Sequence, residues 1–377
     1  MDLEEIRKNI DSVDKEIIAL YEKRMELSKQ VAEYKIGTGK PVKDAAREAS
    51  KLKAAEDLAS NDFNKKGVRE LFTQIMSASR KLQYSLIAKN VDDNFGFKET
   101  YCIPKDKKVV YQGEEGAYAH EATLKYFGND VLCYNAPTWR DAMEDIKNGK
   151  ADYAVLPIEN STAGIVNTVY DLLVEYDNYI VDEVSVPVSH KLVGIKGTKL
   201  SDIKKVISHP QALMQCERFL SSHNDWTTEA FSNTAAAALK VSKDNDKSVA
   251  ALSSAVAAKL YGLEILADNI VGSDLNTTRF VIVGKDKVYC KDADKISLCF
   301  ELPHEAGSLY NALSHCIYNG INMTKIESRP IPERKWEYRF FINIEGKFMD
   351  ASVKNALIGL EGDATTLKIM GTYHSQD

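Results

Sequence analysis

The chain has 377 residues and a mass of 42.1 kDa, which is too long for one hydrophobic core and predicts two or three domains. Hydrophobic residues make up 44% and charged residues 28%, and this mix excludes a wholly disordered, collagen-like or low-complexity chain. The formal net charge of −6 argues against a general nucleic-acid binder, which would carry a strongly basic face, and favours small-molecule chemistry.

Residues 1–90 are predicted to be helical. Apolar residues recur at steps of three and four from Leu3 to Tyr34, which predicts one helix about 50 Å long. Two more helices are predicted over 44–60 and 64–89. Such a long helix needs an equally long partner, because three helices with one long arm do not close a compact monomer easily. We therefore predict an all-α, three-helix, intertwined homodimer at least.

Polar residues interrupt the apolar faces of the predicted helices in residues 1–90. Arg24 occupies a core position of the first helix, and Lys35 lies eleven residues on, within about 20° of the same face. Ser79 and Gln83 continue the apolar stripe of the third helix at spacing i, i+4. An unpaired charge inside a helical seam is costly, so these groups predict a pocket for a small, multiply charged anion. The region is itself net positive, with 18 Lys plus Arg against 15 Asp plus Glu.

A second polar cluster lies on the second helix. Asp44, Arg47 and Glu48 stand at spacing i, i+3, i+4 and allow two interpretations. They form either a solvated group of ion pairs or a further part of the anion pocket.

This region resembles the all-helical class of chorismate mutase, whose site has eight polar positions. All eight are present, namely Arg7, Arg24, Lys35, Asp44, Arg47, Glu48, Ser79 and Gln83. The resemblance implies a pericyclic rearrangement of chorismate to prephenate, in which the protein clamps the reactive conformer and complements the charge at the breaking C–O bond. It further implies that Arg7 of another subunit, Arg24 and Arg47 hold carboxylates with help from Ser79. Lys35 and Gln83 would face the ether oxygen, and Asp44 and Glu48 the hydroxyl side.

The pattern of apolar and polar residues changes after residue 90. Residues 91–107 lose the helical period and are interpreted as a linker. Strand and helix signals then alternate over 108–285, which predicts a two-lobed α/β region with mostly parallel sheet. From 292 to 377 the order becomes strand, helix, strand, strand, helix, strand, the ferredoxin-like βαββαβ arrangement.

Five polar clusters of the α/β region fall at predicted strand-to-helix junctions or beside a strand, where open α/β sheets bind ligands. They are GEEGAY (113–118), PIENSTAG (157–164), SHPQALMQC (208–216), SNTAAAA (232–238) and NTTRF (276–280). Each alone is compatible with a tight turn and a helix cap, and His209 before Pro210 is interpreted as structural. GEEGAY is not the GxGxxG fingerprint of dinucleotide binding.

In this order the clusters resemble prephenate dehydratase, whose fold is similar to that of periplasmic binding proteins. TRF is the hallmark of that family, and Thr278 is the position whose hydroxyl the family requires. The resemblance implies loss of CO2 and hydroxide from prephenate to give phenylpyruvate, with Thr278 donating a hydrogen bond and Glu159 as a candidate acid. The candidate carboxylate-binding residues are Asn160, Ser161, Gln215, Ser232 and Thr234.

The last region resembles an ACT regulatory domain. ESRP, residues 327–330, is a signature of dehydratase-type ACT domains that sense phenylalanine, although such a segment can also be a strand-ending turn. The second signature of the family, usually Gly-Ala-Leu-Val, reads Gly-Ser-Leu-Tyr at 307–310, and Tyr310 places a bulky ring near the expected effector pocket. The resemblance implies inhibition of the dehydratase by L-phenylalanine bound at Gly307, Ser308, Leu309, Glu327, Ser328 and Arg329.

Together the three resemblances predict a bifunctional chorismate mutase/prephenate dehydratase of phenylalanine biosynthesis. Two alternatives stay open at this point. The mutase could be fused to a prephenate dehydrogenase, which would need a nicotinamide fingerprint, or the α/β part could be a two-lobed amino-acid sensor without activity.

The remaining expectations concern location and cofactors. The six cysteines are scattered without CxxC spacing, so neither a disulfide framework nor a zinc site is predicted, and we expect no metal or cofactor. No stretch reaches the roughly 18 apolar residues that a membrane span needs. We therefore expect a cytoplasmic protein with neither membrane nor nucleic-acid partners.

Overall fold

The computed structural model describes residues 2–90, 95–271, 276–332 and 334–376. It divides into two units, of which the first comprises Met1–Gly96 with Asp294–Ile369 and the second comprises Phe97–Ala293 with Met370–Asp377. Within the described residues, no helix is both long and apolar enough to cross a membrane.

Three helices form the N-terminal part of the first unit. They are α1 (Leu3–Thr38), α2 (Ala45–Asp57) and α3 (Asp62–Asn90), close to the predicted ranges. The side chain of Asp2 caps the start of α1 by accepting a hydrogen bond from the Glu4 amide at 3.4 Å. Gly39, with φ of 67°, ends α1 in a left-handed conformation that suits glycine. With 36 residues, α1 is about 54 Å long.

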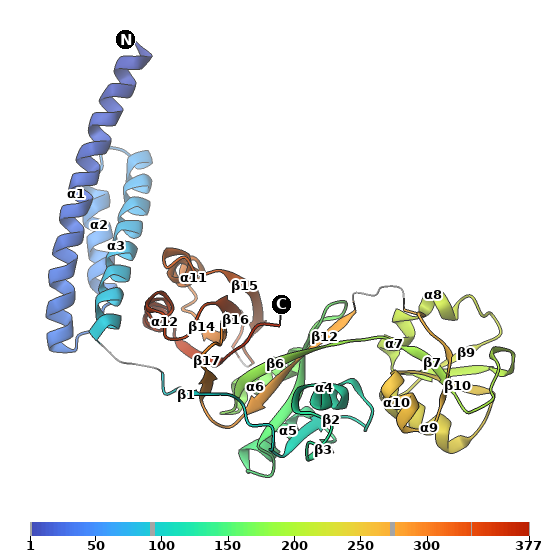
Figure 1. Cartoon of the computed structure of the whole chain (residues 1–377). Helices are drawn as coiled ribbons and strands as arrows, with labels where there is room; N and C mark the ends of the chain where they lie inside the picture. Colours follow the sequence, from blue (N-terminus) through green and yellow to red (C-terminus); the bar gives the residue numbers. More distant parts are fainter. Residues whose placement is uncertain (1, 91–94, 272–275, 333, 377) are drawn as a thin grey trace. The chain divides into compact units, whose positions relative to one another are not determined.

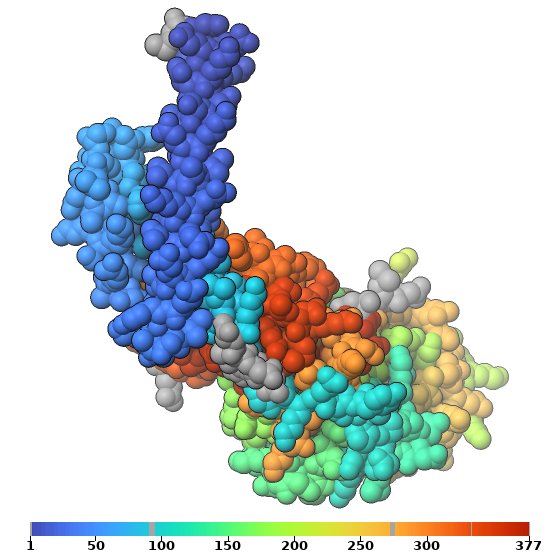
Figure 2. All heavy atoms as spheres, turned by 60° about the vertical axis from the view of Figure 1, so that its left-hand side comes forward, coloured from blue at the N-terminus to red at the C-terminus, as the bar shows by residue number. Residues whose placement is uncertain are grey.

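The apolar stripe on the N-terminal half of α1 is exposed. Ile10 is 54% exposed and Ile17 53%, whereas Ala32 near the other end of the helix is buried. Figure 1 shows the first turns of α1 extending past the ends of α2 and α3, and Figure 2 shows the same dark-blue segment standing clear of them. The two shorter helices therefore leave the first turns of α1 uncovered.

The C-terminal part of the first unit has the predicted order of strands and helices. The elements are β14 (Lys295–Glu301), α11 (Ser308–Tyr318), β15 (Met323–Pro330), β16 (Tyr338–Glu345), α12 (Ala351–Asp363) and β17 (Thr366–Tyr373). The strands lie in the order β15-β16-β14-β17, and β16 is antiparallel to both of its neighbours. Helix α12 packs against α3 in this unit, where a Cβ atom at Gly362 would overlap the hydroxyl of Tyr84.

The second unit has two lobes, each built on its own sheet. The first lobe contains β2 (Val109–Gln112), β3 (Cys133–Ala136), β4 (Tyr153–Asn160), β5 (Gly164–Ile165), β6 (Tyr179–Pro187) and β12 (Thr277–Gly284), with α4 (Tyr118–Phe127), α5 (Trp139–Lys147) and α6 (Asn167–Glu175). The second lobe contains β7 (Lys191–Gly194), β8 (Lys205–Ser208), β9 (Thr227–Ala230), β10 (Val249–Ser253) and β11 (Glu264–Ala267), with α7 (Pro210–Gln215), α8 (Glu217–Leu220), α9 (Thr234–Asp244) and α10 (Ala255–Leu260).

The prediction of mostly parallel sheet is wrong, because both sheets are mixed. Strand β2 is parallel to β3 and β4, but β12 is antiparallel to β4 and β6. In the other lobe, β8 is parallel to β9 and β10, whereas β7 is antiparallel to β10 and β11. The chain leaves the first lobe along β6 and returns along β12. A strand that returns across the lobe boundary must run opposite to the strand that left.

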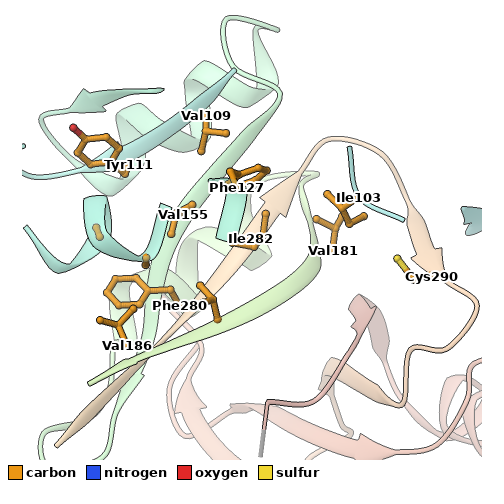
Figure 3. Close-up of a cluster of buried hydrophobic side chains, with 13 residues drawn as sticks. Ile103, Val109, Tyr111, Phe127, Val155, Val181, Val186, Phe280, Ile282 and Cys290 are labelled. Carbon is orange, nitrogen blue, oxygen red and sulfur yellow. The ribbon is translucent and has the colours of Figure 1, made fainter. Parts of the chain in front are cut away.

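Part of the predicted linker over 91–107 is folded, and residues 91–94 lie outside the described residues. Lys98–Thr100 forms strand β1, which pairs in parallel with β13 (Val288–Cys290). Phe97 is buried and its ring packs edge-on against Tyr179, with the centroids 5.7 Å apart. Figure 3 shows Ile103 within the apolar cluster of the first lobe. These apolar side chains attach the segment to the lobe, because their burial removes them from water.

Candidate active sites and effector region

Arg24 on α1 and Ser79 on α3 meet inside the helical part. The guanidinium of Arg24 donates from Nη1 to the Ser79 hydroxyl and, at 3.4 Å, to the carbonyl oxygen of Ile75. Burial lowers the pKa of Arg24, and Tyr21 acts in the opposite direction. A guanidinium remains charged at neutral pH, so a half-buried cation lies in the predicted pocket.

Lys35 lies on α1 beyond Arg24. Its ammonium donates to the carbonyl oxygen of Val42 at 2.6 Å. Burial lowers the pKa of Lys35, while the nearby charges of Asp44 and Glu48 raise it. Lys35 therefore lies close to Asp44 and Glu48, which the resemblance to chorismate mutase assigns to the same site.

The cluster on α2 is not a set of mutual ion pairs. Asp44 caps α2 by accepting a hydrogen bond from the amide of Arg47 at 3.0 Å, and both side chains are exposed. Glu48 instead accepts a hydrogen bond of 2.6 Å from Arg80 on α3, a buried residue that the sequence did not indicate. Gln83 is buried, and its Oε1 has no hydrogen-bond partner among the described residues. A buried amide oxygen of this kind is available to a ligand.

Arg7 is not brought to the other seven positions. It precedes Arg24 by seventeen residues on the same straight helix, a separation of about 26 Å along the axis. A side chain cannot span this distance, so Arg7 cannot serve the site of its own chain.

A cavity of about 670 Å³ lies between the two lobes of the second unit. The sequence-predicted residues that line it are Asn160, Gln215, Ser232, Thr234 and Thr278. Among its described lining residues, Glu114 carries the one ionisable carboxylate, and no lysine or arginine is present. The starts of α4 and α9 contribute Tyr118 and Thr234 to the wall. Helix N-termini carry partial positive charge, so this cavity suits anions without a cationic side chain.

Thr278 and Asn160 are neighbours across β12 and β4 in this cavity. Asn160 donates from Nδ2 to the Thr278 hydroxyl oxygen at 2.9 Å. The orientation of the Asn160 amide is fixed, because its Oδ1 accepts hydrogen bonds from the backbone amides of Thr162 and Ala163. The Thr278 oxygen is thus an acceptor for Asn160, and its own proton remains available to donate elsewhere.

Glu159 and Ser161 are not among the residues that line the cavity. Successive side chains of a strand point to opposite faces, and Glu159 shares its face with Arg279, to which it is ion-paired at 3.4 Å. The Ser161 hydroxyl accepts a hydrogen bond from the backbone amide of Thr277 at 3.0 Å. The sequence motif thus contains residues of both faces, and only the strand geometry separates them.

The region predicted to bind an effector also has a cavity, of about 360 Å³. Gly307, with φ of 85°, precedes α11, and Ser308 and Leu309 line this cavity. Tyr310 lies outside the lining and is 55% exposed, so its ring does not fill the space. The ESRP signature lies on the neighbouring strand β15, which pairs with β16. Glu327, Ser328 and Arg329 are not among the residues that line this cavity. Strand β16 contributes Phe340 to it, the register partner of Ser328.

Comparison with known proteins finds two family models that match separate parts of the chain. A chorismate mutase type II family model matches residues 6–84, and a prephenate dehydratase model matches residues 109–288. The bifunctional chorismate mutase/prephenate dehydratase of Enterobacter agglomerans is 32% identical over 379 aligned positions, covering 99% of this chain and 96% of that protein. The chain belongs to the bifunctional chorismate mutase/prephenate dehydratase family. It is an enzyme of phenylalanine biosynthesis with both activities, and this decides against the dehydrogenase fusion and the inactive sensor.

Solved structures resemble a large part of this bifunctional enzyme. A prephenate dehydratase from Arthrobacter aurescens in complex with L-Phe is 29% identical, with a TM-score of 0.67, and covers 71% of this chain and 90% of that one. A protein described as a novel type of quorum quenching acylase, GqqA, is 30% identical, with a TM-score of 0.66, and covers 71% of this chain and 98% of that one.

The dehydratase cavity of the bifunctional enzyme also contains polar residues that the sequence did not indicate, among them Tyr118 and His190. Tyr118 lies at the start of α4, and His190 lies between β6 and β7. Tyr118 falls at the end of the GEEGAY cluster, so its motif gave a weak signal. His190 follows a strand in no recognisable motif, and only the folded chain brings it to the cavity.

Proposed function

We propose that residues 1–90 carry the mutase reaction, residues 108–285 the dehydratase reaction, and residues 292–377 an ACT regulatory domain of ferredoxin-like fold. The family matches support the first two assignments. The βαββαβ order of elements supports the third. The observation that carries the dehydratase assignment is the Asn160–Thr278 hydrogen bond in an anion-compatible cavity.

In the proposed mutase site, cations and neutral donors surround chorismate. Arg24 and Arg47 hold the carboxylates with Ser79, and Lys35 and Gln83 face the ether oxygen. The reaction transfers no proton, so these groups act by holding the reactive conformer and stabilising the negative charge that develops on the ether oxygen. The contact of Arg24 with Ser79 and the burial of Gln83 support this placement. Asp44 and Glu48 take the hydroxyl side.

A second copy of the chain completes this site in our proposal. The exposed stripe on α1 that includes Ile10 and Ile17 supports such a dimer, because a partner helix would remove it from water. Arg7 then reaches the site of the partner, which explains why it lies about 26 Å from Arg24 along its own helix.

In the proposed dehydratase site, Thr278 assists the departure of hydroxide from prephenate. The electrons of the breaking bond to the carboxylate move into the ring, CO2 leaves, and the hydroxyl departs from the opposite ring carbon. Asn160 donates to the Thr278 oxygen, so the Thr278 hydroxyl remains free to donate a hydrogen bond to the leaving oxygen. Gln215, Ser232 and Thr234 bind carboxylates. Glu159 and Ser161 do not line this cavity, and Glu159 is paired to Arg279, so the proposal gives neither of them a contact with prephenate.

We extend the proposal to regulation by L-phenylalanine at the region formed by Gly307, Ser308, Leu309, Glu327, Ser328 and Arg329. The dehydratase of Arthrobacter aurescens was solved with L-Phe, which supports this choice of effector. A cavity of about 360 Å³ beside Ser308 supports the location. The effector then lowers dehydratase activity by binding one conformation more tightly than the other. A cytoplasmic location stays a prediction.

One assay tests the two placements together. The full chain converts chorismate to phenylpyruvate without added nucleotide if both sites are assigned correctly. Arg24→Ala should stop the first step and Thr278→Val the second, so that prephenate accumulates only in the second variant. If Thr278→Val still forms phenylpyruvate at the normal rate, the dehydratase site lies elsewhere.

A further inference from the structure

His190 lies where the chain crosses from the first lobe to the second. Strand β6 ends at Pro187 and β7 begins at Lys191, and between them the His190 side chain is buried at 4% exposure. Its Nδ1 is 3.1 Å from the hydroxyl of Tyr118 in the first lobe. Its Nε2 is 3.1 Å from Oε1 of Gln215 in the second lobe. The imidazole thus bridges the two walls of the dehydratase cavity.

The hydrogen bonds around Asn160 determine the orientation of each amide in turn. Backbone N–H groups point at Asn160 Oδ1, so its Nδ2 is the atom that faces Asn276 Oδ1 at 2.8 Å. Asn276 therefore presents its own Nδ2 to Gln215 Oε1 at 3.1 Å. The Gln215 Nε2 donates at 3.1 Å to the hydroxyl of Thr162, which agrees with this orientation. Gln215 Oε1 is consequently an acceptor, and any group facing it must donate.

This requirement selects one tautomer of His190. Nε2 must carry the hydrogen, because it faces the acceptor Oε1 of Gln215. Nδ1 is then bare and accepts the hydrogen bond of the Tyr118 hydroxyl. Burial lowers the pKa of His190 to about 4, opposed by its hydrogen bond to Gln215 and reinforced by the nearby His209. The ring is therefore neutral at physiological pH, which agrees with Nδ1 accepting the hydrogen bond of Tyr118.

We infer that His190 is a positioning residue of the dehydratase: as the Nε2–H tautomer it fixes the amide of Gln215 and thereby joins the second lobe to the Asn276–Asn160–Thr278 chain of hydrogen bonds. The inference rests on the proposed placement of the dehydratase site at Thr278. His190 does not contact the reacting atoms in this scheme. Its effect on the reaction passes through Gln215, which holds a carboxylate of prephenate.

The test compares two replacements of His190 in the full chain. His190→Leu removes one of the two donors to Gln215 Oε1 and leaves only Asn276. It should lower kcat/KM for prephenate by about 10- to 100-fold, mostly through a higher KM, because the Gln215 amide is then held less firmly. His190→Gln can present an amide N–H near the position of Nε2 and should recover most of this loss. His223→Leu is the matched control, since His223 stacks on Trp226 in the same unit, outside the cavity lining.

A spectroscopic measurement separates positioning from packing. The ¹⁵N spectrum of histidine-labelled protein reports the protonation of each ring. The His190 signals are assigned as those that are missing from the spectrum of His190→Gln. They should show a neutral ring with hydrogen on Nε2 from pH 6 to 8. A ring that titrates in this range, or that carries its hydrogen on Nδ1, overturns the inference. So does equal activity of His190→Leu and wild type, or equal loss in the Leu and Gln variants. If Thr278→Val is also fully active, the proposed placement of the dehydratase site is wrong. If only the His190 variants are fully active, the proposed role of His190 is wrong.

Discussion

Asn160 Nδ2 lies 2.9 Å from the hydroxyl oxygen of Thr278, across the antiparallel pair of strands β4 and β12. The two residues are far apart in the sequence, and each stands at the end of its strand where the sheet meets the cavity between the lobes. The hydrogen bond holds the threonine rotamer and leaves its proton free to act on a ligand. The first prediction follows from this relationship.

Thr278→Ser should stay active in prephenate dehydration, whereas Thr278→Val should lose about two or more orders of magnitude in kcat. Serine keeps the hydroxyl, and valine keeps the shape without it, so the pair separates chemistry from packing. The rate of phenylpyruvate formation from supplied prephenate measures the effect. Mutase activity of the same preparations is the control and should not change. Equal rates in the two variants would show that the hydroxyl is dispensable.

Arg24→Ala should lower mutase kcat/KM by at least about 100-fold while the variant still dehydrates prephenate. The loss is expected because Arg24 is a half-buried cation in contact with Ser79. Prephenate formation from chorismate is the measurement. Normal mutase activity in the folded variant would remove Arg24 from the site, and loss of both activities would indicate a folding defect.

Arg7→Ala should also abolish mutase activity, and co-expression with Arg24→Ala should restore about a quarter of it. If each site takes Arg7 from one copy and Arg24 from the other, half of the randomly formed dimers are mixed, and each mixed dimer has one intact site. Sedimentation of the mixture confirms that the dimer persists. Failure to restore activity, with both variants dimeric, would place Arg7 outside the site.

L-phenylalanine should bind the full chain and lower dehydratase activity, with little direct effect on the mutase. Ser308→Trp should weaken binding, because Ser308 lines the cavity that we assign to the effector. Ser352→Trp is the matched control, since Ser352 is an exposed serine in the first turn of α12. Calorimetric titration of the protein with L-phenylalanine measures binding, and the two activity assays measure its effect on the dehydratase and the mutase. No heat of binding at millimolar phenylalanine would contradict the assignment of this region as a phenylalanine sensor.

Asp363 should stabilise the first unit at neutral pH and cease to do so in acid. Burial alone would raise the pKa of Asp363, but its hydrogen bond with His315 at 2.9 Å and the charges of Arg80 and Lys43 outweigh burial and lower it. A carboxyl with a lowered pKa in the folded state contributes stability above its unfolded pKa and loses it as pH falls through the folded value. Asp363→Asn should therefore cost about 3 kcal/mol at pH 7, the scale of a broken buried ion pair.

Urea unfolding followed by far-UV circular dichroism measures this cost. The difference between wild type and Asp363→Asn should shrink as the pH is lowered below about 4, where the unfolded carboxyl becomes protonated. Glu70→Gln removes an exposed carboxylate on α3 of the same unit and should change little at either pH. A difference that stays constant with pH would mean that Asp363 acts by packing and not by charge.

Several features of this enzyme were determined by the sequence alone. The helices of residues 1–90 follow from the period of their apolar residues, and the same period placed Arg24, Ser79 and Gln83 on faces that meet. The order of strands and helices after residue 294 likewise follows from the local alternation of strand and helix signals in the sequence. These features depend on residues close together in the chain, whose side-chain pattern fixes the local backbone geometry.

Only the tertiary structure decided which polar residues share a site. Glu159 and Asn160 are adjacent in one motif, yet strand geometry sends Asn160 to the cavity and Glu159 to Arg279. His190 has no motif and reaches the cavity because the chain crosses between lobes there, and Arg80 joins Glu48 because α2 packs on α3. Such contacts depend on how whole elements pack. The energy that selects the packing is the burial of many distant apolar side chains, which no local pattern specifies.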